Sequence, residues 1–312
     1  MEISGASMIA NTLRKIRRHG ILGSANLLYE RLRRKSAYDI WRCRNGQEYT
    51  NPTDAELLKI ERALKDSGVP VQDYDPSPAG FTDFKAAEYF PSDYHGGIQS
   101  GVWDEKLLEH WIAAEVLDLF KYGKDDIYVD VAACGSPWAQ VLRARHGIQS
   151  FAIDLEVPYS FSTLDFYIKE NATRTHFADA SVRGLSLQCA FEMFLDSDDI
   201  ELVPEIKRIL IPGGKAIILP LYMHTHYCAY STPEFFAKGY SDIGAVEYVQ
   251  LGAWGVPSSR KYDAVSLKER LLDIIEREGL EYTILVLRNK AEFGSEIHCH
   301  FILEITKPGN DR

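Results

Sequence analysis

The sequence contains no apolar run that approaches the roughly 20 residues needed to cross a bilayer. Its acidic start, Met1-Glu2, differs from the basic and then apolar beginning of a secretory signal peptide. The five cysteines are scattered, odd in number and without a C-x-x-C pair. A disulfide framework is therefore not expected, and free thiols in a reducing compartment are favoured. We expect a cytoplasmic protein.

A surplus of basic residues is also missing, since the net charge is −10. Generic nucleic-acid binding needs a basic surface, so nucleic-acid partners are not expected. No internal repeat or low-complexity segment is present. With 312 residues and 46% hydrophobic content, the chain can bury one large core with an appendage. Nothing in this composition predicts the oligomeric state.

The first 50 residues differ from this average, because they hold ten Lys and Arg against four Asp and Glu. Residues 9–35 predict one or two amphipathic helices, with basic clusters beside apolar positions. Two interpretations stay open: peripheral contact with an anionic membrane at its inner face, or a solvated basic helix packed on the acidic remainder.

The most informative stretch runs from residue 125 to residue 156. Ile127 to Val131 is a short apolar run typical of a buried strand. A turn of small residues follows, and Ser136-Pro137 then suits the start of a helix. That helix should reach about His146 and end at Gly147.

A second strand should then run from Gln149 to Ile153 and end on Asp154. This strand–turn–helix–strand unit suits a nucleotide-like ligand. Small residues let the ligand approach the backbone, and the carboxylate at the strand end can accept both ribose hydroxyls.

These residues resemble the cofactor half of the class I S-adenosylmethionine (SAM) dependent methyltransferases. His176 to Ala180 (HFADA) resembles the family's third-strand segment. Leu185 to Phe194 (LSLQCAFEMF) and Glu205 to Lys215 (EIKRILIPGGK) resemble its fourth strand and the turn into its fifth. The resemblance covers residues 125–222 with the segments in the correct order.

The resemblance implies SAM as the cofactor, with Asp130 as the acid ending the first strand, Asp154 on the ribose and Asp179 on the adenine. The full set of cofactor-binding residues implied comprises Asp130, Ala132, Cys134, Gly135, Ser136, Asp154, Leu155, Asp179, Ala180, Phe191 and Glu192. Ala132 and Cys134 depart from the family, which has glycines there. At positive φ a β-carbon costs on the order of 1 kcal/mol or more, so a non-catalytic methyltransferase-like binding protein stays an alternative. The absence of G-x-G-x-x-G at this turn argues against a nicotinamide oxidoreductase.

The resemblance implies an α/β, Rossmann-like, mostly parallel seven-stranded sheet with a closing antiparallel hairpin. We expect an N-terminal extension over 1–102 and the methyltransferase-like domain over 103–312, with a long acceptor-side insertion at 223–262. Further expected elements are helices at Ala55–Lys65, Trp103–Phe120, Leu164–Lys169, Asp198–Leu210 and Ser266–Glu278, a covering loop at Pro70–Pro91, and strands at Lys215–Tyr222, Glu281–Arg288 and Glu296–Ile305.

The methyl acceptor is not encoded in a motif, and an oxygen of a small molecule or a glycan is the expected acceptor. His224 and His226 follow the fifth strand and are the candidate catalytic residues, as general bases. Together with Cys228 and His298-Cys299-His300 they offer soft ligands for zinc, but polar surface positions explain them as well and no metal is assigned. Arg260, Lys261 and Tyr262 suit either an anionic acceptor or salt bridges to the surplus acids.

Overall fold

The computed structural model describes residues 36, 47–133, 135–236, 242–251 and 256–309. The basic segment 9–35 and the cofactor-turn residue Cys134 lie outside the described residues, so the predictions on them stay predictions. By its internal contacts the chain divides into two units. One comprises 1–50, 229–241 and 247–258, and the other comprises 51–228, 242–246 and 259–312.

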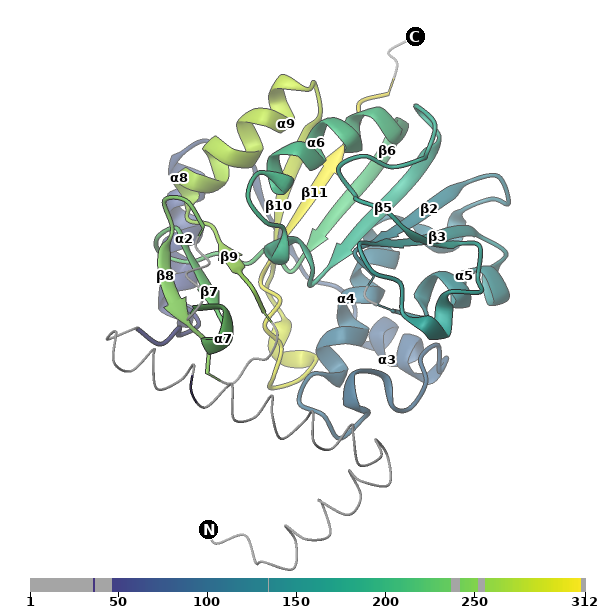
Figure 1. The fold of residues 1–312 in the computed structure, drawn as a ribbon, viewed down its shortest axis with the longest axis horizontal. Helices are drawn as coiled ribbons and strands as arrows, with labels where there is room; N and C mark the ends of the chain where they lie inside the picture. The colour runs from purple at the N-terminus through teal and green to yellow at the C-terminus, as the bar shows by residue number, and fades with distance from the viewer. Residues whose placement is uncertain (1–35, 37–46, 134, 237–241, 252–255, 310–312) are drawn as a thin grey trace, which may run out of the picture. The chain divides into compact units, whose positions relative to one another are not determined.

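The larger unit is built on an eight-stranded sheet of order β1-β10-β11-β6-β5-β2-β3-β4 (Figure 1). All neighbouring strands are parallel except for the two pairs that involve β11. The strands are β1 (Val71–Tyr74), β2 (Ile127–Val131), β3 (Gln149–Asp154), β4 (Tyr167–Lys169), β5 (Val182–Gln188), β6 (Leu210–Leu219), β10 (Glu281–Leu287) and β11 (Phe301–Thr306). The expected α/β, Rossmann-like, mostly parallel sheet is thus present, with eight strands rather than seven. Its antiparallel pair β10–β11 differs from the expected hairpin, because β11 begins at Phe301 and not at Glu296.

One face of this sheet is covered by α2, α6 and the α8–η5–α9 helix. Val129 and Val131 of β2 and Ile284 and Val286 of β10 point into this core. These helices are α2 (Asp54–Asp66), α6 (Asp198–Ile209), α8 (Ala264–Leu267), η5 (Lys268–Leu272) and α9 (Asp273–Arg277). The start of α2 follows from sequence, because the Thr53 hydroxyl accepts from the Glu56 N–H while the Glu56 carboxylate accepts from the Thr53 N–H.

The opposite face carries α3 (Pro78–Ala86), α4 (Trp103–Val116) and α5 (Trp138–His146). The intervening strand residues, such as Tyr128, point into this second core. Successive side chains of a strand therefore point into opposite cores, as expected for a sheet that is covered by helices on both faces. As predicted, α5 ends where Gly147 adopts a left-handed conformation.

Two local predictions are wrong. Pro70–Pro91 is not a covering loop but contains β1 and α3, and α3 begins where the Ser77 hydroxyl accepts from the Gly80 N–H. Its Phe81 and Phe84 are buried in the second core. Leu164–Lys169 is not a helix, because Tyr167–Lys169 pairs with β3 as the edge strand β4. Residues 51–102 thus include an edge strand of the main sheet.

The remaining strands, β7 (Cys228–Ser231), β8 (Val246–Val249) and β9 (Ser259–Lys261), form a three-stranded sheet, and α7 (Pro233–Phe236) is a single helical turn. Within the smaller unit, the Tyr49 ring contacts Tyr230 at 4.8 Å and Tyr248 at 6.1 Å between centroids. The Tyr49 N–H donates to the Val249 carbonyl. Segment 223–262 therefore has short elements of its own. Within the described part of the chain, no helix is long and apolar enough to span a membrane.

Candidate functional site

The carboxyl ends of β2, β3 and β5 lie at one edge of the sheet. In the register of the strands, Val131 of β2 stands opposite both Ile153 of β3 and Leu187 of β5. Asp130 and Asp154 therefore lie on neighbouring strand ends, as predicted. In open α/β sheets, ligands bind beyond this edge.

The turn that follows β2 has a backbone suited to close approach by a ligand. Ala132 and Gly135 adopt left-handed φ values of 54° and 79°. The Ala133 N–H donates to the Ile153 carbonyl, and the Ser136 N–H donates to the Ala133 carbonyl. The Ser136 hydroxyl accepts from the Trp138 N–H at 3.2 Å, which places it at the start of α5.

Ala132 thus has a left-handed backbone conformation, which glycine adopts without steric strain. Ala132→Gly is expected to keep or raise the free energy of unfolding, because the left-handed region costs alanine roughly 1–2 kcal/mol. Ala133 has no positive φ, so Ala133→Gly is the matched control and should lower it by roughly 0.5–1 kcal/mol. Urea unfolding measures both variants. Equal losses in the two would contradict strain at Ala132.

Asp130 is the buried acid of this edge. It is 1% exposed, and its Oδ2 has no hydrogen-bond partner among the described residues. Burial and, to a smaller extent, the nearby Asp154 raise the pKa of Asp130 to about 8, against the opposing effect of the Ser136 hydroxyl. A buried carboxyl with an unused oxygen is suited to a cationic partner.

Asp154 is half-buried at the last position of β3. Its Oδ1 accepts from the Glu156 N–H at 3.0 Å, which orients the carboxylate at the strand end. Leu155 beside it is 61% exposed. An exposed apolar residue next to the carboxylate is compatible with a flat ligand lying there.

Asp179 and Ala180 are not brought to this edge. His176–Ala180 is not the expected third strand, because the strand that pairs with β3 is β4 at Tyr167–Lys169. Asp179 and Ala180 instead precede the amino end of β5. The Ala180 N–H donates to the Arg208 carbonyl at the end of α6, and the Asp179 side chain, 81% exposed, pairs with the Arg208 guanidinium at 2.8 Å. The structure places them at the opposite edge of the sheet, away from Asp130 and Asp154.

Phe191 and Glu192 follow β5 in the short helix η4 (Phe191–Met193). Phe191 is buried, and its ring stacks on Tyr262 with 6.1 Å between centroids. Glu192 is 7% exposed, its Oε1 lies 3.4 Å from the Cys189 sulfur, and its Oε2 has no hydrogen-bond partner among the described residues. Phe191 therefore serves the core, whereas Glu192 offers a buried acceptor.

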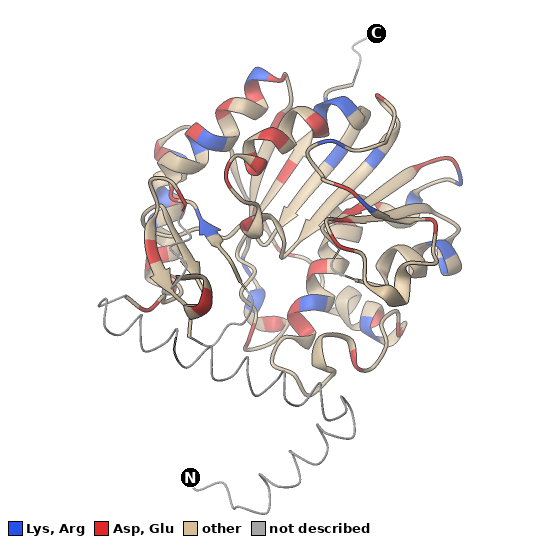
Figure 2. Cartoon of the chain, in the orientation of Figure 1, with Lys and Arg blue, Asp and Glu red and all other residues tan. Residues whose placement is uncertain are grey.

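Helix α4 places further charged side chains near this edge, and sequence reasoning missed them. The Glu105 carboxylate accepts from the backbone N–H groups of His298 and Cys299. The Lys106 ammonium lies 3.0 Å from both oxygens of Glu109. Burial raises the pKa of Glu109 to about 8, although this ammonium favours the ionised carboxylate and opposes the rise. Figure 2 shows acidic and basic residues together on α4.

Tyr94 connects these charges with the turn after β2. Burial raises its pKa, the Ser136 hydroxyl opposes the rise, and the carboxylates of Asp130 and Glu109 add to it. The Tyr94 hydroxyl lies 2.9 Å from a ring nitrogen of His110. Asp130, Ser136 and the charged side of α4 therefore belong to one polar region.

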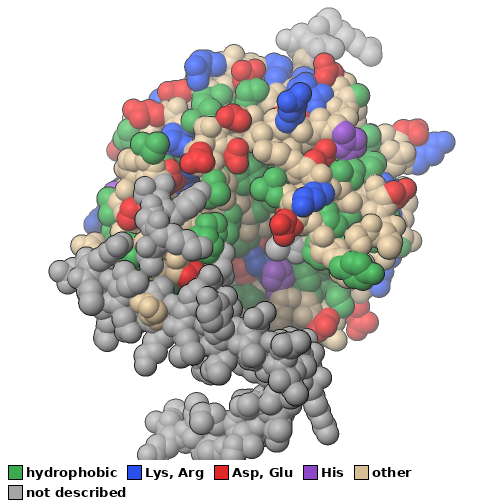
Figure 3. Space-filling model, viewed as in Figure 1, with side chains coloured by type: hydrophobic (Ala, Val, Ile, Leu, Met, Phe, Trp, Pro, Cys, Tyr) green, Lys and Arg blue, Asp and Glu red, His purple; other side chains and the backbone are tan. Residues whose placement is uncertain are grey.

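A second buried cation, Lys261, lies near the end of β5. Its ammonium lies 3.9 Å from the centre of the Tyr222 ring and 2.9 Å from the Ser259 hydroxyl. Burial lowers its pKa, and Glu192 opposes that shift. In Figure 1 the arrowheads of β5 and β6 point to the region above α4, and Figure 3 shows a hollow there that contains basic and histidine side chains.

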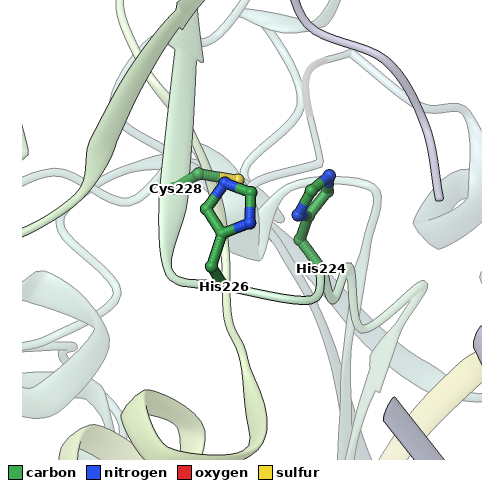
Figure 4. A group of neighbouring side chains, drawn as sticks. All are labelled: His224, His226 and Cys228. Carbon is green, nitrogen blue, oxygen red and sulfur yellow. The ribbon is translucent and has the colours of Figure 1, made fainter. Parts of the chain in front are cut away.

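His224 and His226 follow β6, as predicted. His224 is 8% exposed, and the two ring centroids are 4.4 Å apart. Donor atoms of His224, His226 and Cys228 lie within 4.8 Å of one another (Figure 4). His298, Cys299 and His300 are not part of this group. Arg260, in contrast, is buried in ion pairs with Asp199 and Asp242, as the salt-bridge interpretation expected.

No family model and no curated protein matches this sequence. Similar solved structures include the 1,6-didemethyltoxoflavin-N1-methyltransferase of Burkholderia thailandensis, at 15% identity over 77% of this chain and 94% of that one, with a TM-score of 0.44. The geranyl diphosphate C-methyltransferase of Streptomyces coelicolor is similar at 15% identity, over 68% of this chain and 85% of that one, with a TM-score of 0.38. These likenesses are too distant to assign an activity to this chain.

Proposed function

We propose that this chain is a SAM-dependent methyltransferase that binds its cofactor at the carboxyl edge of β2, β3 and β5. The carrying observation is the pairing of Asp130 and Asp154 on neighbouring strand ends around a turn with a left-handed backbone. This arrangement offers one buried and one edge carboxylate beside an accessible backbone.

The residues present fit SAM. The cofactor carries a cationic ammonium and a sulfonium at its methionine end, and the orphaned Oδ2 of Asp130 needs a cationic or donating partner. Asp154, held by the Glu156 N–H, suits the ribose hydroxyls. When bound, SAM supplies an activated methyl group whose leaving group is a neutral thioether. Asp179 has no part in this site.

The acceptor would enter from the hollow over β5 and β6. Glu109, Glu192 and Lys261 are buried titratable side chains, and Lys106 beside Glu109 is half-buried. Such a lining favours a polar, hydroxyl-rich acceptor over an apolar one, because buried charges are costly to leave without partners. An oxygen of a small molecule or a glycan fits this chemistry.

The protein's main contribution would be positioning, since a sulfonium methyl needs little acid–base help. A proton leaving the acceptor hydroxyl needs a base within hydrogen-bond reach. His224 and His226 were predicted for this task, and the buried Glu192 Oε2 adds a carboxylate candidate. Both assignments belong to the proposal.

Isothermal calorimetry of the full chain with SAM and with its demethylated product tests the proposal. We expect binding of both at micromolar level. Asp154→Asn should weaken binding about 10- to 100-fold, because hydrogen bonds to a charged group contribute roughly 1.5–3 kcal/mol each.

Asp179→Asn is the matched control, since it changes an acid at the opposite edge of the sheet and should leave affinity unchanged. No heat with either ligand would overturn the cofactor proposal and favour the non-catalytic module. Equal weakening by both substitutions would overturn the placement of the site. Incubation with labelled SAM and fractionated cell extract then identifies the acceptor.

A further inference from the structure

A group of metal-ligating side chains lies in the segment that joins β6 to β7. His224, His226 and Cys228 occupy alternate positions of this segment, and Cys228 is the first residue of β7. The chain bends at Thr225 and His226, between the first and the last of these positions. Their donor atoms lie within 4.8 Å of one another, and Figure 4 shows a ring nitrogen of His226 directed at the Cys228 sulfur while the other faces His224.

The backbone holds these positions in place. The His224 N–H donates to the Tyr262 carbonyl at 2.7 Å, and Met223 forms a parallel bridge with Tyr262. The Val246 N–H donates to the Tyr227 carbonyl at 3.0 Å. The flanking residues of the group are thus tied to other segments of the same unit. A site built on restrained backbone loses little entropy when a ligand binds.

The burial of these side chains and the type of their donor atoms indicate which metal ion the group would bind. Cys228 is fully buried and His224 is 8% exposed. Two imidazoles and a thiolate match the preferences of Zn²⁺ and related divalent transition metals, whereas Mg²⁺ and Ca²⁺ prefer oxygen. Ligands of a tetrahedral zinc stand roughly 3.5 Å apart, given metal bonds of about 2.0–2.3 Å. Side-chain rotation closes the remaining gap.

The Thr225 hydroxyl assists this arrangement. It lies 3.3 Å from Nδ1 of His226. When Nδ1 carries the proton and donates to this hydroxyl, Nε2 of His226 keeps its lone pair for a metal. Metal-bound histidines commonly use the second ring nitrogen in this way.

We propose that His224, His226 and Cys228 form a three-ligand site for a divalent transition metal of the zinc type, with a fourth position open to an exogenous ligand. Three protein ligands with an open position are typical of catalytic rather than structural zinc. The metal would act as a Lewis acid on a bound hydroxyl. A ring nitrogen that ligates the metal cannot also take a proton, so for that nitrogen this role replaces the general-base assignment.

Cobalt substitution tests the site without any measurement of methyl transfer. The full chain, purified without a histidine tag and treated with chelator, is titrated with Co²⁺ and then with Zn²⁺. We expect one equivalent of Co²⁺ to give visible ligand-field bands and an ultraviolet thiolate-to-cobalt charge-transfer band. One equivalent of Zn²⁺ should abolish both.

Cys228→Ser should remove the charge-transfer band, and His226→Ala should weaken Co²⁺ binding at least tenfold. Cys299→Ser is the matched control, because Cys299 is another buried thiol that does not belong to the group, and it should keep the band. Absence of the band in the wild-type chain, or its persistence in Cys228→Ser, overturns the proposal.

SAM calorimetry on the same samples measures cofactor binding independently of the cobalt bands. If Cys228→Ser fails to fold, the His226→Ala titration decides the question alone, and unchanged Co²⁺ affinity there overturns the site. Failure of the metal proposal would appear as missing cobalt bands with SAM binding retained. Failure of the methyltransferase proposal would appear as missing SAM binding, which depends on Asp154 and not on the metal-ligating residues.

Discussion

Asp199→Asn is expected to lower the free energy of unfolding by about 3–5 kcal/mol, the range for breaking a buried ion pair from one side. Asp199 is fully buried and serves several donors. The Tyr262 hydroxyl donates to it at 2.7 Å, and Arg270 donates to both of its oxygens. Nη1 of Arg260 lies 2.8 Å from Oδ2, close enough for a strong Coulombic attraction although the angle is not that of a hydrogen bond.

The expected loss of stability is large because the buried partners of Asp199 cannot reach solvent. Arg260 is 1% exposed, and without Asp199 one carboxylate, that of Asp242, remains paired with it among the described residues, beside the Asp196 carbonyl. A charge left short of partners in the interior costs far more than the pair contributes. The amide of asparagine keeps the shape but removes the charge, so the experiment isolates the electrostatic part.

Urea unfolding followed by circular dichroism measures the change. Asp118→Asn is the control, since its pair with Lys121 is exposed on both sides and such pairs contribute about 0–1 kcal/mol. Asparagine also tolerates the left-handed backbone of that position. Similar midpoints for Asp199→Asn and the wild-type chain would show that the network contributes no net stability.

The central unit of the fold was predictable because local and tertiary signals agree there. Ile127 to Val131 is too short for a helix and too apolar for a loop, and Gly147 is a residue that ends helices in the left-handed conformation. Asp130 and Asp154 then follow from strand ends alone. The position of a cofactor site in such a sheet depends on the order of the strands and on where each strand ends, and the sequence pattern predicts the strand ends here.

The errors occur where tertiary pairing decides the structure. Val71–Tyr74 becomes a strand only because it pairs with β10, and four residues hold too little pattern to reveal that. Asp179 was assigned to the third strand by resemblance, but that strand is β4 at Tyr167–Lys169, and Asp179 lies just before the amino end of β5, at the other sheet edge. The start of α3, in contrast, has a sequence signal, because Ser77 is a helix-capping residue and Pro78 suits the first helical position.

The charged residues of α4 were missed for a different reason. Leu107, Leu108 and Trp111 lie at helical spacing and predict an amphipathic helix, and this pattern assigns no role to Glu105 and Glu109. The helix is instead buried almost all round, so its charges are buried as well. Apolar residues on several sides of a helix indicate such burial, and charges on that helix then indicate a site.

Affinity for SAM is expected to rise about tenfold from pH 6 to 7 and about fivefold from pH 7 to 8, because binding of a cation requires the ionised form of Asp130, whose pKa is about 8. Burial holds the pKa of this carboxyl at about 8 in the free protein, so the group is largely protonated at pH 7. A bound ammonium or sulfonium favours the carboxylate and lowers the pKa in the complex. The proton must therefore leave on binding, and lower pH opposes it.

Calorimetry at pH 6, 7 and 8 measures the affinity, and two buffers of different ionisation enthalpy at pH 7 count the proton. Close to one proton should be released per SAM bound. Asp130→Asn removes the titrating group, so any dependence that persists in it belongs to the ligand or to other residues. The same substitution should not lower stability at pH 8, since a raised carboxyl pKa opposes folding once the pH exceeds the unfolded value. Equal pH dependence in both proteins would show that Asp130 does not meet the cationic end of the cofactor.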